Sequence, residues 1–204
     1  MIFTVAIDGP AAAGKGTIAK AVAAHFNYAY LDTGLLYRAA ARRAMDGLDP
    51  VEAAATLTPR DFTRDGLRTA KVGQAASKIA ANPQVRAALI AFQHRFARAE
   101  GGAVLDGRDI GTVICPEAEV KLFITATDTV RAHRRWLELV DKEPGLKEAD
   151  VLTGQRERDK RDSERAVAPL RAADDAVVLD TSAMDTAQAV QATIAVVQAV
   201  LSRV

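Results

Sequence analysis

The residues best suited to chemistry are a lysine and a threonine set among glycines near the start of the chain. Gly9 and four small residues are followed by Gly14, Lys15, Gly16 and Thr17. Glycines let a backbone approach an anion closely and turn its N–H groups toward it. The lysine ammonium suits the terminal phosphates of a triphosphate, and the threonine hydroxyl suits a magnesium ion. The pattern predicts a triphosphate site formed by Gly9, Pro10, Ala11, Ala12, Ala13, Gly14, Lys15, Gly16 and Thr17.

The residues on either side of this loop predict a strand before it and a helix after it. Residues 2–7 form a short apolar run, and Ile18, Val22 and Phe26 recur at helical spacing. In that order the free N–H groups and the dipole of the helix point at a bound anion. A Gly/Ala-rich turn without function would need neither the lysine nor the amphipathic helix, so we favour a P-loop. Its GKGT ending resembles nucleoside monophosphate kinases more than GTPases.

Acidic and basic residues follow a second apolar run. Residues 102–106 read as a buried strand, and Gly107, Arg108 and Asp109 come directly after it. In open α/β sheets, ligands bind beyond the carboxyl ends of the strands. An apolar strand ending in an aspartate, here Asp106, also resembles the acidic partner of magnesium in P-loop enzymes. A polar turn between strands is the alternative interpretation.

Two helical segments in the second half carry arginines on one face. Arg131, Arg134 and Arg135 lie at positions i, i+3 and i+4, and so share a face. Arg158, Asp162 and Arg165 share a face of the next helix, with Arg161 beside them. A solvated basic surface is one interpretation. The other is a lid that closes over phosphates, with Arg131, Arg134 and Arg161 as a clamp.

The remaining segments predict an α/β fold with a parallel sheet covered by helices on both faces. We expect strands at residues 29–31, 120–124 and 177–180, each followed by a helix. Thr33 is expected to cap the helix that begins at Gly34. Tyr37 and Arg38, in that helix, are either site residues or a packed tyrosine and a surface arginine.

The middle of the chain reads as an excursion from the sheet. Residues 46–66 are rich in turn formers, and helices are expected at residues 69–81 and from Pro83 onward. On the second helix an apolar stripe is expected in the core, and Arg86 lies off this stripe, free to reach a ligand or solvent. The stripe consists of Val85, Leu89, Phe92 and Phe96.

Composition limits the class of protein. The chain has 204 residues and a net charge of +1, so no global field favours nucleic acid. Cys115 is the single cysteine, which fits a reducing compartment and an inert buried thiol. The N-terminus lacks signal-peptide features and no apolar run approaches a membrane span. We expect a cytoplasmic monomer without nucleic-acid or membrane partners.

Motifs along nearly the whole chain resemble those of bacterial cytidylate kinases. They are IDGPAAAGKGT, LDTGLLYR, ASKIAANPQVR, LDGRDIGTVICP, RAHRR and RERDKRDSERAVAPL. The resemblance implies that ATP with Mg²⁺ phosphorylates CMP or dCMP, with metal contacts from Thr17 and Asp106. It implies catalytic roles for Lys15, Arg108, Asp109 and Arg158. It implies that the pyrimidine nucleotide is bound by Thr33, Tyr37, Ser77, Arg86, Arg108, Asp109, Arg158, Asp162 and Arg165.

The resemblance also implies a division of the single domain. The core would comprise residues 1–45, 100–126 and 170–204, with a monophosphate-binding insertion at 46–99 and a lid at 127–168. The segment 46–69 is shorter than the strand-rich insertion of the family. Alternatives are a P-loop kinase of AMP, UMP or a metabolite such as shikimate, a nucleotide-dependent switch or binding module, and an inactive paralogue. The arginine and aspartate set at 106–109 and 158–165 argues against another kinase, and no Asn-Lys-x-Asp motif indicates a GTPase.

Overall fold

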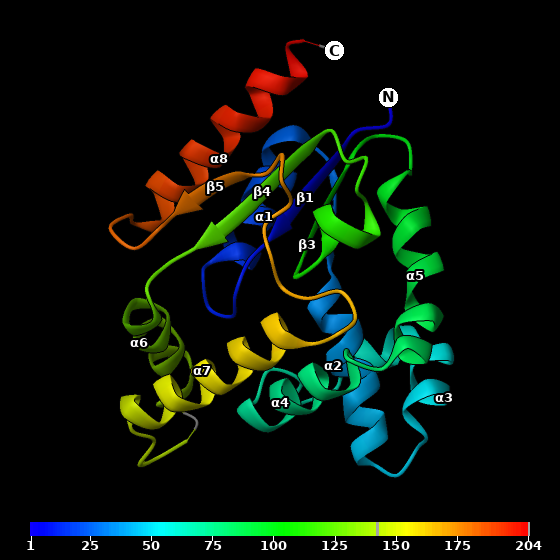
Figure 1. Cartoon of the computed structure of the whole chain (residues 1–204), viewed down its shortest axis with the longest axis vertical. Helices are drawn as coiled ribbons and strands as arrows, with labels where there is room; N and C mark the ends of the chain where they lie inside the picture. Colours follow the sequence, from blue (N-terminus) through cyan, green and yellow to red (C-terminus); the bar gives the residue numbers. More distant parts are fainter. Residues whose placement is uncertain (142, 204) are drawn as a thin grey trace.

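The structure is a computed structural model that describes residues 1–141 and 143–203. Its centre is one sheet of five parallel strands in the order β2-β3-β1-β4-β5 (Figure 1). Parallel neighbours need crossover connections, and helices supply them here. The predicted α/β fold is therefore confirmed. The strands are β1 Thr4–Asp8, β2 Ala29–Asp32, β3 Ala103–Gly107, β4 Val120–Thr125 and β5 Val177–Asp180.

The helices fall close to the predicted positions. A single π-helical turn, η2, spans Ile110–Ile114, and a 3₁₀ helix, η1, spans Pro59–Thr63. The α-helices of the described chain are α1 Lys15–Phe26, α2 Thr33–Met45, α3 Pro50–Ala55, α4 Ala70–Ile79, α5 Pro83–Ala97, α6 Asp128–Leu139, α7 Glu148–Glu164 and α8 Thr186–Leu201.

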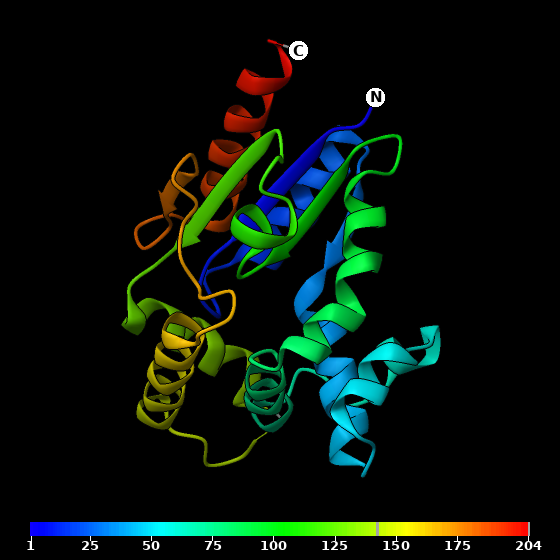
Figure 2. The same cartoon turned by 45° about the vertical axis from the view of Figure 1, so that its right-hand side comes forward.

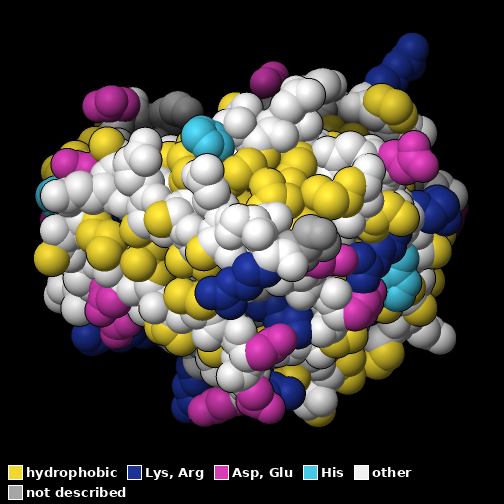
Figure 3. Space-filling view, turned by 90° about the horizontal axis from the view of Figure 1, so that it is seen from above, with side chains coloured by type: hydrophobic (Ala, Val, Ile, Leu, Met, Phe, Trp, Pro, Cys, Tyr) yellow, Lys and Arg dark blue, Asp and Glu magenta, His cyan; other side chains and the backbone are white. Residues whose placement is uncertain are grey.

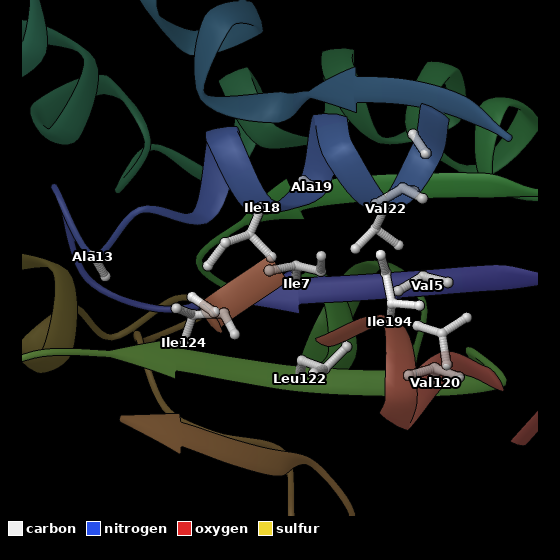
Figure 4. Close-up of a cluster of buried hydrophobic side chains, with 14 of the residues drawn as sticks. Val5, Ile7, Ala13, Ile18, Ala19, Val22, Val120, Leu122, Ile124 and Ile194 are labelled. Atoms are coloured by element: carbon white, nitrogen blue, oxygen red, sulfur yellow. The ribbon is translucent and has the colours of Figure 1, made fainter. Parts of the chain in front are cut away.

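Alternate residues of each central strand face opposite layers, because side chains alternate along a strand. On one face, Val5 and Ile7 of β1 pack with Ile18 of α1 and Ile194 of α8 (Figure 4). On the other face, Ala6 lies with residues of β3, α5 and η2. Both faces of the sheet are thus covered by helices, which explains the almost continuous apolar character of the strands.

A third cluster of buried side chains holds α2, α3, α4 and α5 together beside the sheet. Leu36 and Tyr37 of α2 contact Ala76 of α4 and Val85 of α5 in this cluster. Helix α4 also packs against α7, and both lie below the carboxyl ends of the strands in Figure 1. Figure 2 shows α6 and α7 on one side of this end of the molecule and α2 to α5 on the other. The segments expected to bind ligands therefore converge at one edge of the sheet.

Two local predictions are wrong. The cap of α2 is Asp32, whose side chain accepts a 2.9 Å hydrogen bond from the Leu35 N–H, and the helix already begins at Thr33. Aspartate and threonine are both good N-caps, so the sequence alone does not show which of the two neighbouring residues caps α2. Phe92 is 43% exposed, whereas Val85 and Leu89 are buried as expected. Residues 46–66 are also more regular than expected, because they contain α3 and η1.

Both chain ends lie at the end of the molecule opposite α6 and α7 (Figure 1). Figure 3 looks onto that end, where Lys and Arg side chains are interspersed with Asp and Glu among apolar and neutral groups. Within residues 1–141 and 143–203, no helix has both the length and the apolar character needed to cross a bilayer.

Candidate active site

The loop between β1 and α1 has the geometry of a phosphate-binding loop. A Cβ atom on Gly9 would lie 1.9 Å from the carbonyl oxygen of Ile124, so only glycine fits there. Gly14 precedes α1 in the left-handed region, with φ at 89°. Buried Lys15 donates a 2.8 Å hydrogen bond from Nζ to the Pro10 carbonyl, and the Thr17 side chain is exposed at the cavity beside it. Residues 9–17 thus form the connection between β1 and the first turn of α1, and their binding of a triphosphate stays a prediction.

The charge on Lys15 is costly in the free protein. Burial lowers the pKa of Lys15 to about 7, and the positive charge of Arg108 acts in the same direction. The carboxylates of Asp106 and Asp8 oppose this shift. A bound polyanion would favour the ammonium form, because an opposite charge nearby stabilises it.

Asp106 lies against the first turn of α1. Its Oδ2 is 3.3 Å from the position of a Cβ atom on Gly16, and it accepts a 2.9 Å hydrogen bond from the Tyr30 hydroxyl. Burial raises the pKa of Asp106 to about 6, and the charge of Asp32 adds to the effect. The predicted metal partner thus lies beside the loop, with Thr17 one residue beyond Gly16.

Asp8 fixes the position of the segment after β3. Its two carboxylate oxygens accept hydrogen bonds from the N–H groups of Ile110, at 2.8 Å, and Gly111, at 2.7 Å. Burial raises the pKa of Asp8 to about 7, although these two hydrogen bonds act in the opposite direction. Asp8 was absent from the predicted site because it reads as the end of a strand, and only the fold brings it to residue 110.

One cavity of about 420 Å³ extends from the loop to α7. Lys15, Asp106, Arg108 and Ser77 line it, as does Asp162. All nine residues predicted for the monophosphate line this cavity, as do the residues predicted for the triphosphate except Gly9, Pro10 and Ala13.

Arginines from three elements converge in the middle of this cavity. They are Arg38 of α2, Arg108 after β3 and Arg158 of α7. Burial lowers the pKa of Arg158 to about 9, followed in importance by repulsion from Arg108. Burial likewise lowers the pKa of Arg38 to about 10, with repulsion from Arg135 as the next cause. Asp162 lies against two of these arginines, and the convergence of three like charges on one cavity is typical of an anion site.

Asp162 connects these arginines to α4. It accepts a 2.6 Å hydrogen bond from the Ser77 hydroxyl and lies 3.2 Å from Arg108 Nε and 3.8 Å from Arg158 Nε. Burial alone would raise its pKa, but Arg108 and Arg158 outweigh burial and hold the pKa of Asp162 below its usual range. Asp162 therefore remains ionised and able to accept hydrogen bonds.

The far end of the cavity contains a second charged group. Arg86 forms a buried ion pair with Asp109, and Arg165 Nη2 lies 3.4 Å from the same carboxylate. The Tyr37 ring centroid is 6.0 Å from the Arg86 guanidinium carbon. Among the described residues, Arg86 Nη1 is buried without a hydrogen-bond partner. The alternative of a solvent-exposed Arg86 is therefore wrong, and a ligand contact of Arg86 stays a prediction.

Thr33 has a local structural partner. Its hydroxyl donates a 2.7 Å hydrogen bond to the Asp106 carbonyl while the residue lines the cavity. This bond ties the first turn of α2 to the end of β3. It also explains why Thr33 does not serve as the helix cap.

The three arginines predicted as a lid clamp contact protein groups in this structure. Arg131 donates from Nη1 to the Ala11 carbonyl at 3.1 Å. Arg134 donates to the Thr181 carbonyl at 2.8 Å. Arg161 donates to Gln74 Oε1 at 2.8 Å and to the Ser77 hydroxyl at 3.2 Å. None of the three lines the cavity among the residues described, so their clamp role stays a prediction.

Sequence reasoning missed Arg68 and left Arg135 out of the site. Both line the cavity, where Arg68 Nη2 lies 2.8 Å from Asp32 Oδ2 and Arg135 donates to the Arg68 carbonyl. Arg68 follows a turn-rich segment without periodicity, so the sequence carried no signal for it. Arg135 was recognised on the basic face of its helix, and the fold alone shows that it faces the cavity.

The parallel sheet, the P-loop and the arginine-lined cavity define the chain as a P-loop kinase. An uncharacterized protein from Eubacterium ventriosum ATCC 27560 has a similar fold, with a TM-score of 0.59 and 16% identity over 96% of this chain and 98% of its own. A gluconokinase from Sinorhizobium meliloti 1021 gives a TM-score of 0.54 and 16% identity over 99% and 95%. At these identities the likeness concerns the fold alone.

Sequence comparison identifies the family. The profile of the cytidylate kinase family matches residues 5–59 and 51–199. A cytidylate kinase of Cereibacter sphaeroides strain KD131 is 66% identical over 182 residues, which cover 89% of this chain and 88% of the relative. One from Xanthobacter autotrophicus is 55% identical over 203 residues, covering 97% and 98%. The chain belongs to the cytidylate kinase family, which confirms the resemblance and makes it a phosphotransferase.

The same coverage bears on the short segment 46–69. The 203 aligned residues cover 97% of this chain and 98% of the relative from Xanthobacter autotrophicus, so the two chains have nearly the same length.

Proposed function

We propose that the protein transfers the γ-phosphoryl group of ATP to CMP or dCMP, giving ADP and CDP or dCDP. The observation that carries the proposal is the single cavity that joins Lys15 and the converging arginines to the Arg86–Asp109 pair. Membership of the cytidylate kinase family supports the same reaction. Pyrimidine nucleotide metabolism is the corresponding role.

ATP would bind along residues 9–17. The N–H groups of the loop and of the first turn of α1 would hold its phosphates, with Lys15 at the terminal ones. Among the described residues, no three His, Cys, Asp or Glu form a metal-binding group. Magnesium commonly shares one or two protein ligands with substrate phosphates, and Thr17 and Asp106 fit that need. The ion would neutralise charge on the transferred group.

The acceptor phosphate would bind among Arg38, Arg108, Arg158 and Arg165. Repulsion between two polyanions is the main obstacle to in-line transfer, and bidentate arginine contacts reduce it. The attacking phosphate oxygen is already ionised, so no general base is needed. Lys15, Arg108 and Arg158 would stabilise charge in the transition state.

The nucleoside would occupy the space between Asp162 and the Arg86–Asp109 pair. Asp162 would accept from the sugar hydroxyls. Cytosine has an N4 amino group that donates hydrogen bonds. The Asp109 carboxylate would accept one of them, with Ser77 nearby. The unpartnered Arg86 Nη1 would donate to an acceptor atom of the base, and Tyr37 would pack beside it. Uracil would place its O4 acceptor against the Asp109 carboxylate, which is also an acceptor, so binding of UMP would be disfavoured.

The lid and the insertion would close over the two nucleotides. Residues 127–168 would form the lid and residues 46–99 the acceptor-binding insertion on the remaining core. Closure excludes water, which otherwise hydrolyses ATP. Arg131, Arg134 and Arg161 could exchange their protein partners for phosphates on closure. A monomer in the cytoplasm stays our expectation.

Direct identification of the product tests the proposal. The protein is incubated with Mg²⁺, γ-labelled ATP and CMP, and the nucleotides are separated by anion exchange. We expect the label in CDP. Label in inorganic phosphate alone would contradict the kinase proposal and favour a nucleotide-dependent switch, and transfer only to AMP or UMP would indicate a different monophosphate kinase.

A further inference from the structure

Gly73 of α4 lies against two of the converging arginines. A Cβ atom on Gly73 would be 3.1 Å from Arg38 Nη2 and 3.3 Å from Arg38 Nη1. It would also be 3.4 Å from Arg158 Nη1. The two contacts to Arg38 are tighter than van der Waals separation, and the contact to Arg158 is at the short end of the ordinary range. The guanidinium group of Arg38 therefore occupies space that a side chain at position 73 would need, and Arg158 borders that space.

The backbone does not explain the glycine. Gly73 lies inside a helix and is not among the glycines with positive φ. Alanine is the best helix former and glycine is among the poorest, so alanine would favour α4 itself. What distinguishes Gly73 is the pair of cationic groups against it.

These two guanidinium groups keep donors available. Arg38 is held by a 2.8 Å hydrogen bond from Nη1 to the Leu67 carbonyl, which leaves its Nη2 beside Gly73. Within the described chain, Arg158 Nε has no hydrogen-bond partner and lies 3.8 Å from the Asp162 carboxylate, whereas its Nη1 is the atom beside Gly73. Both residues line the cavity with Arg108. Two forks of N–H groups thus meet over one glycine, a suitable arrangement for the oxygens of a phosphate group.

We propose that Gly73 is a positioning residue, which leaves the space that Arg38 and Arg158 need to converge on the phosphate group of the acceptor. A methyl group there would push at least one guanidinium away by a few tenths of an ångström. The identity of the anion as a nucleoside monophosphate rests on the function proposed above. The role of the glycine rests on the contacts around it.

The test is Gly73→Ala, examined by steady-state kinetics and thermal unfolding. Small misplacements of binding groups are costly, so we expect the KM for CMP to rise roughly three- to tenfold. The KM for ATP should stay unchanged, and the midpoint of thermal unfolding should stay equal or rise. A merely structural glycine would instead lower the midpoint and leave the KM for CMP unaltered, which would overturn the proposal.

Gly154→Ala is the matched control. It makes the same change within α7, where the added methyl would meet only Gln74 Nε2, at 3.8 Å, an ordinary contact. We expect its KM for CMP to stay within about twofold of the wild type, since no guanidinium is displaced. Gly154 also lines the cavity, so an equal rise in both variants would overturn the role of Gly73, because helix propensity or any methyl group in the cavity lining would then account for it.

A double variant keeps the proposal testable if Gly73→Ala folds poorly. Lysine at position 38 lacks the two nitrogen atoms that lie against Gly73. In the Arg38→Lys background, adding Gly73→Ala should therefore raise the KM for CMP by a smaller factor than Gly73→Ala does in the wild type. An equal rise of the KM for CMP in both backgrounds would contradict the proposal that Gly73 acts by positioning Arg38.

Inorganic phosphate separates this proposal from the assigned reaction. Phosphate should raise the thermal midpoint of the wild type, and raise it less in Gly73→Ala. Equal protection of the two proteins would overturn the role of Gly73. Absence of CMP turnover in the wild type would overturn the proposed function, while a difference in phosphate protection would still support the positioning role.

Discussion

The hydroxyl of Ser77 donates a 2.6 Å hydrogen bond to the carboxylate of Asp162, and both residues are buried. The bond joins α4 to α7, which are 85 positions apart at these residues. Arg161 adds a second link, because it donates to Gln74 and to Ser77. The two walls of the cavity are therefore connected by direct protein contacts, and the connection uses a residue assigned to the sugar.

Replacing Ser77 by alanine should loosen this connection. Asp162 would keep its arginines but lose a hydrogen bond inside the protein, which costs about 1–3 kcal/mol of unfolding free energy. We expect the KM for CMP to rise as well, because the Asp162 carboxylate loses its orientation. Urea unfolding and initial rates measure the two effects. Ser202→Ala, which removes an exposed hydroxyl at the end of α8, serves as the control, and equal behaviour of both variants would speak against the role of Ser77.

Arg158→Lys keeps the charge and removes the planar fork of donors. Charge-assisted hydrogen bonds contribute about 1.5–3 kcal/mol, so kcat/KM for CMP should fall roughly ten- to a hundredfold. Arg156→Lys offers a matched control on the same helix, since its side chain is 59% exposed and pairs with Asp128. We expect Arg156→Lys to retain full activity. Equal losses in the two variants would argue against an Arg158 contact with phosphate.

Asp8 should make stability depend on pH. Its pKa is about 7 in the folded state against 3.8 as the ordinary value, so between these pH values the native state holds a proton that the unfolded state lacks. The contribution of Asp8 to the free energy of unfolding is fully present below about pH 4. It is lost as the pH rises to about 7, at no more than about 1.4 kcal/mol per pH unit. Asp109 reinforces the shift and Lys15 opposes it.

Urea unfolding at pH 5 and pH 8 checks this expectation. The wild type should lose more unfolding free energy between these conditions than Asp8→Asn, which cannot titrate at this position. The variant will be less stable at both values, because its amide N–H group faces a backbone N–H, so the informative quantity is the difference between the two pH values. The same difference in both proteins would show that Asp8 does not titrate in this range.

Cys115 should be inert in the folded protein. Its side chain is 1% exposed, and burial raises the pKa of the thiol to about 12. Only the thiolate reacts with disulfide reagents, and at pH 8 its fraction would be roughly 10⁻⁴. We expect negligible labelling of the native protein and one equivalent after unfolding in urea. Rapid labelling without denaturant would contradict the buried position.

Much of the fold and of the candidate site could be predicted from patterns among residues close together in the sequence. The loop at 9–17 could be recognised because glycine spacing, Lys15 and the following helix agree, and each depends only on neighbours in the chain. Arg158 and Asp162 could be placed on one helical face for the same reason, whereas Arg165 follows the last residue of α7 in extended backbone, so its predicted place on that face is wrong. The helix expected after the strand at 177–180 is present as α8.

Other features depend on contacts between distant segments. The stripe on α5 is regular, but its partners cover Val85 and Leu89 and leave Phe92 exposed. The spacing of Arg131, Arg134 and Arg135 suits a phosphate-binding face, yet Arg131 donates to the backbone carbonyl of Ala11 in the loop. Neither outcome can be read from periodicity, because it depends on which surface reaches the residue from elsewhere in the fold.

Acceptor choice tests the central claim most directly. ADP release is measured with Mg·ATP and each of CMP, dCMP, UMP and AMP, and kcat/KM is compared. Because a site built for the N4 amino group leaves Asp109 opposed by the O4 of uracil, we expect CMP and dCMP to exceed the others by roughly a hundredfold or more. Equal or faster turnover with UMP or AMP would contradict the assignment of the Arg86–Asp109 end of the cavity to cytosine.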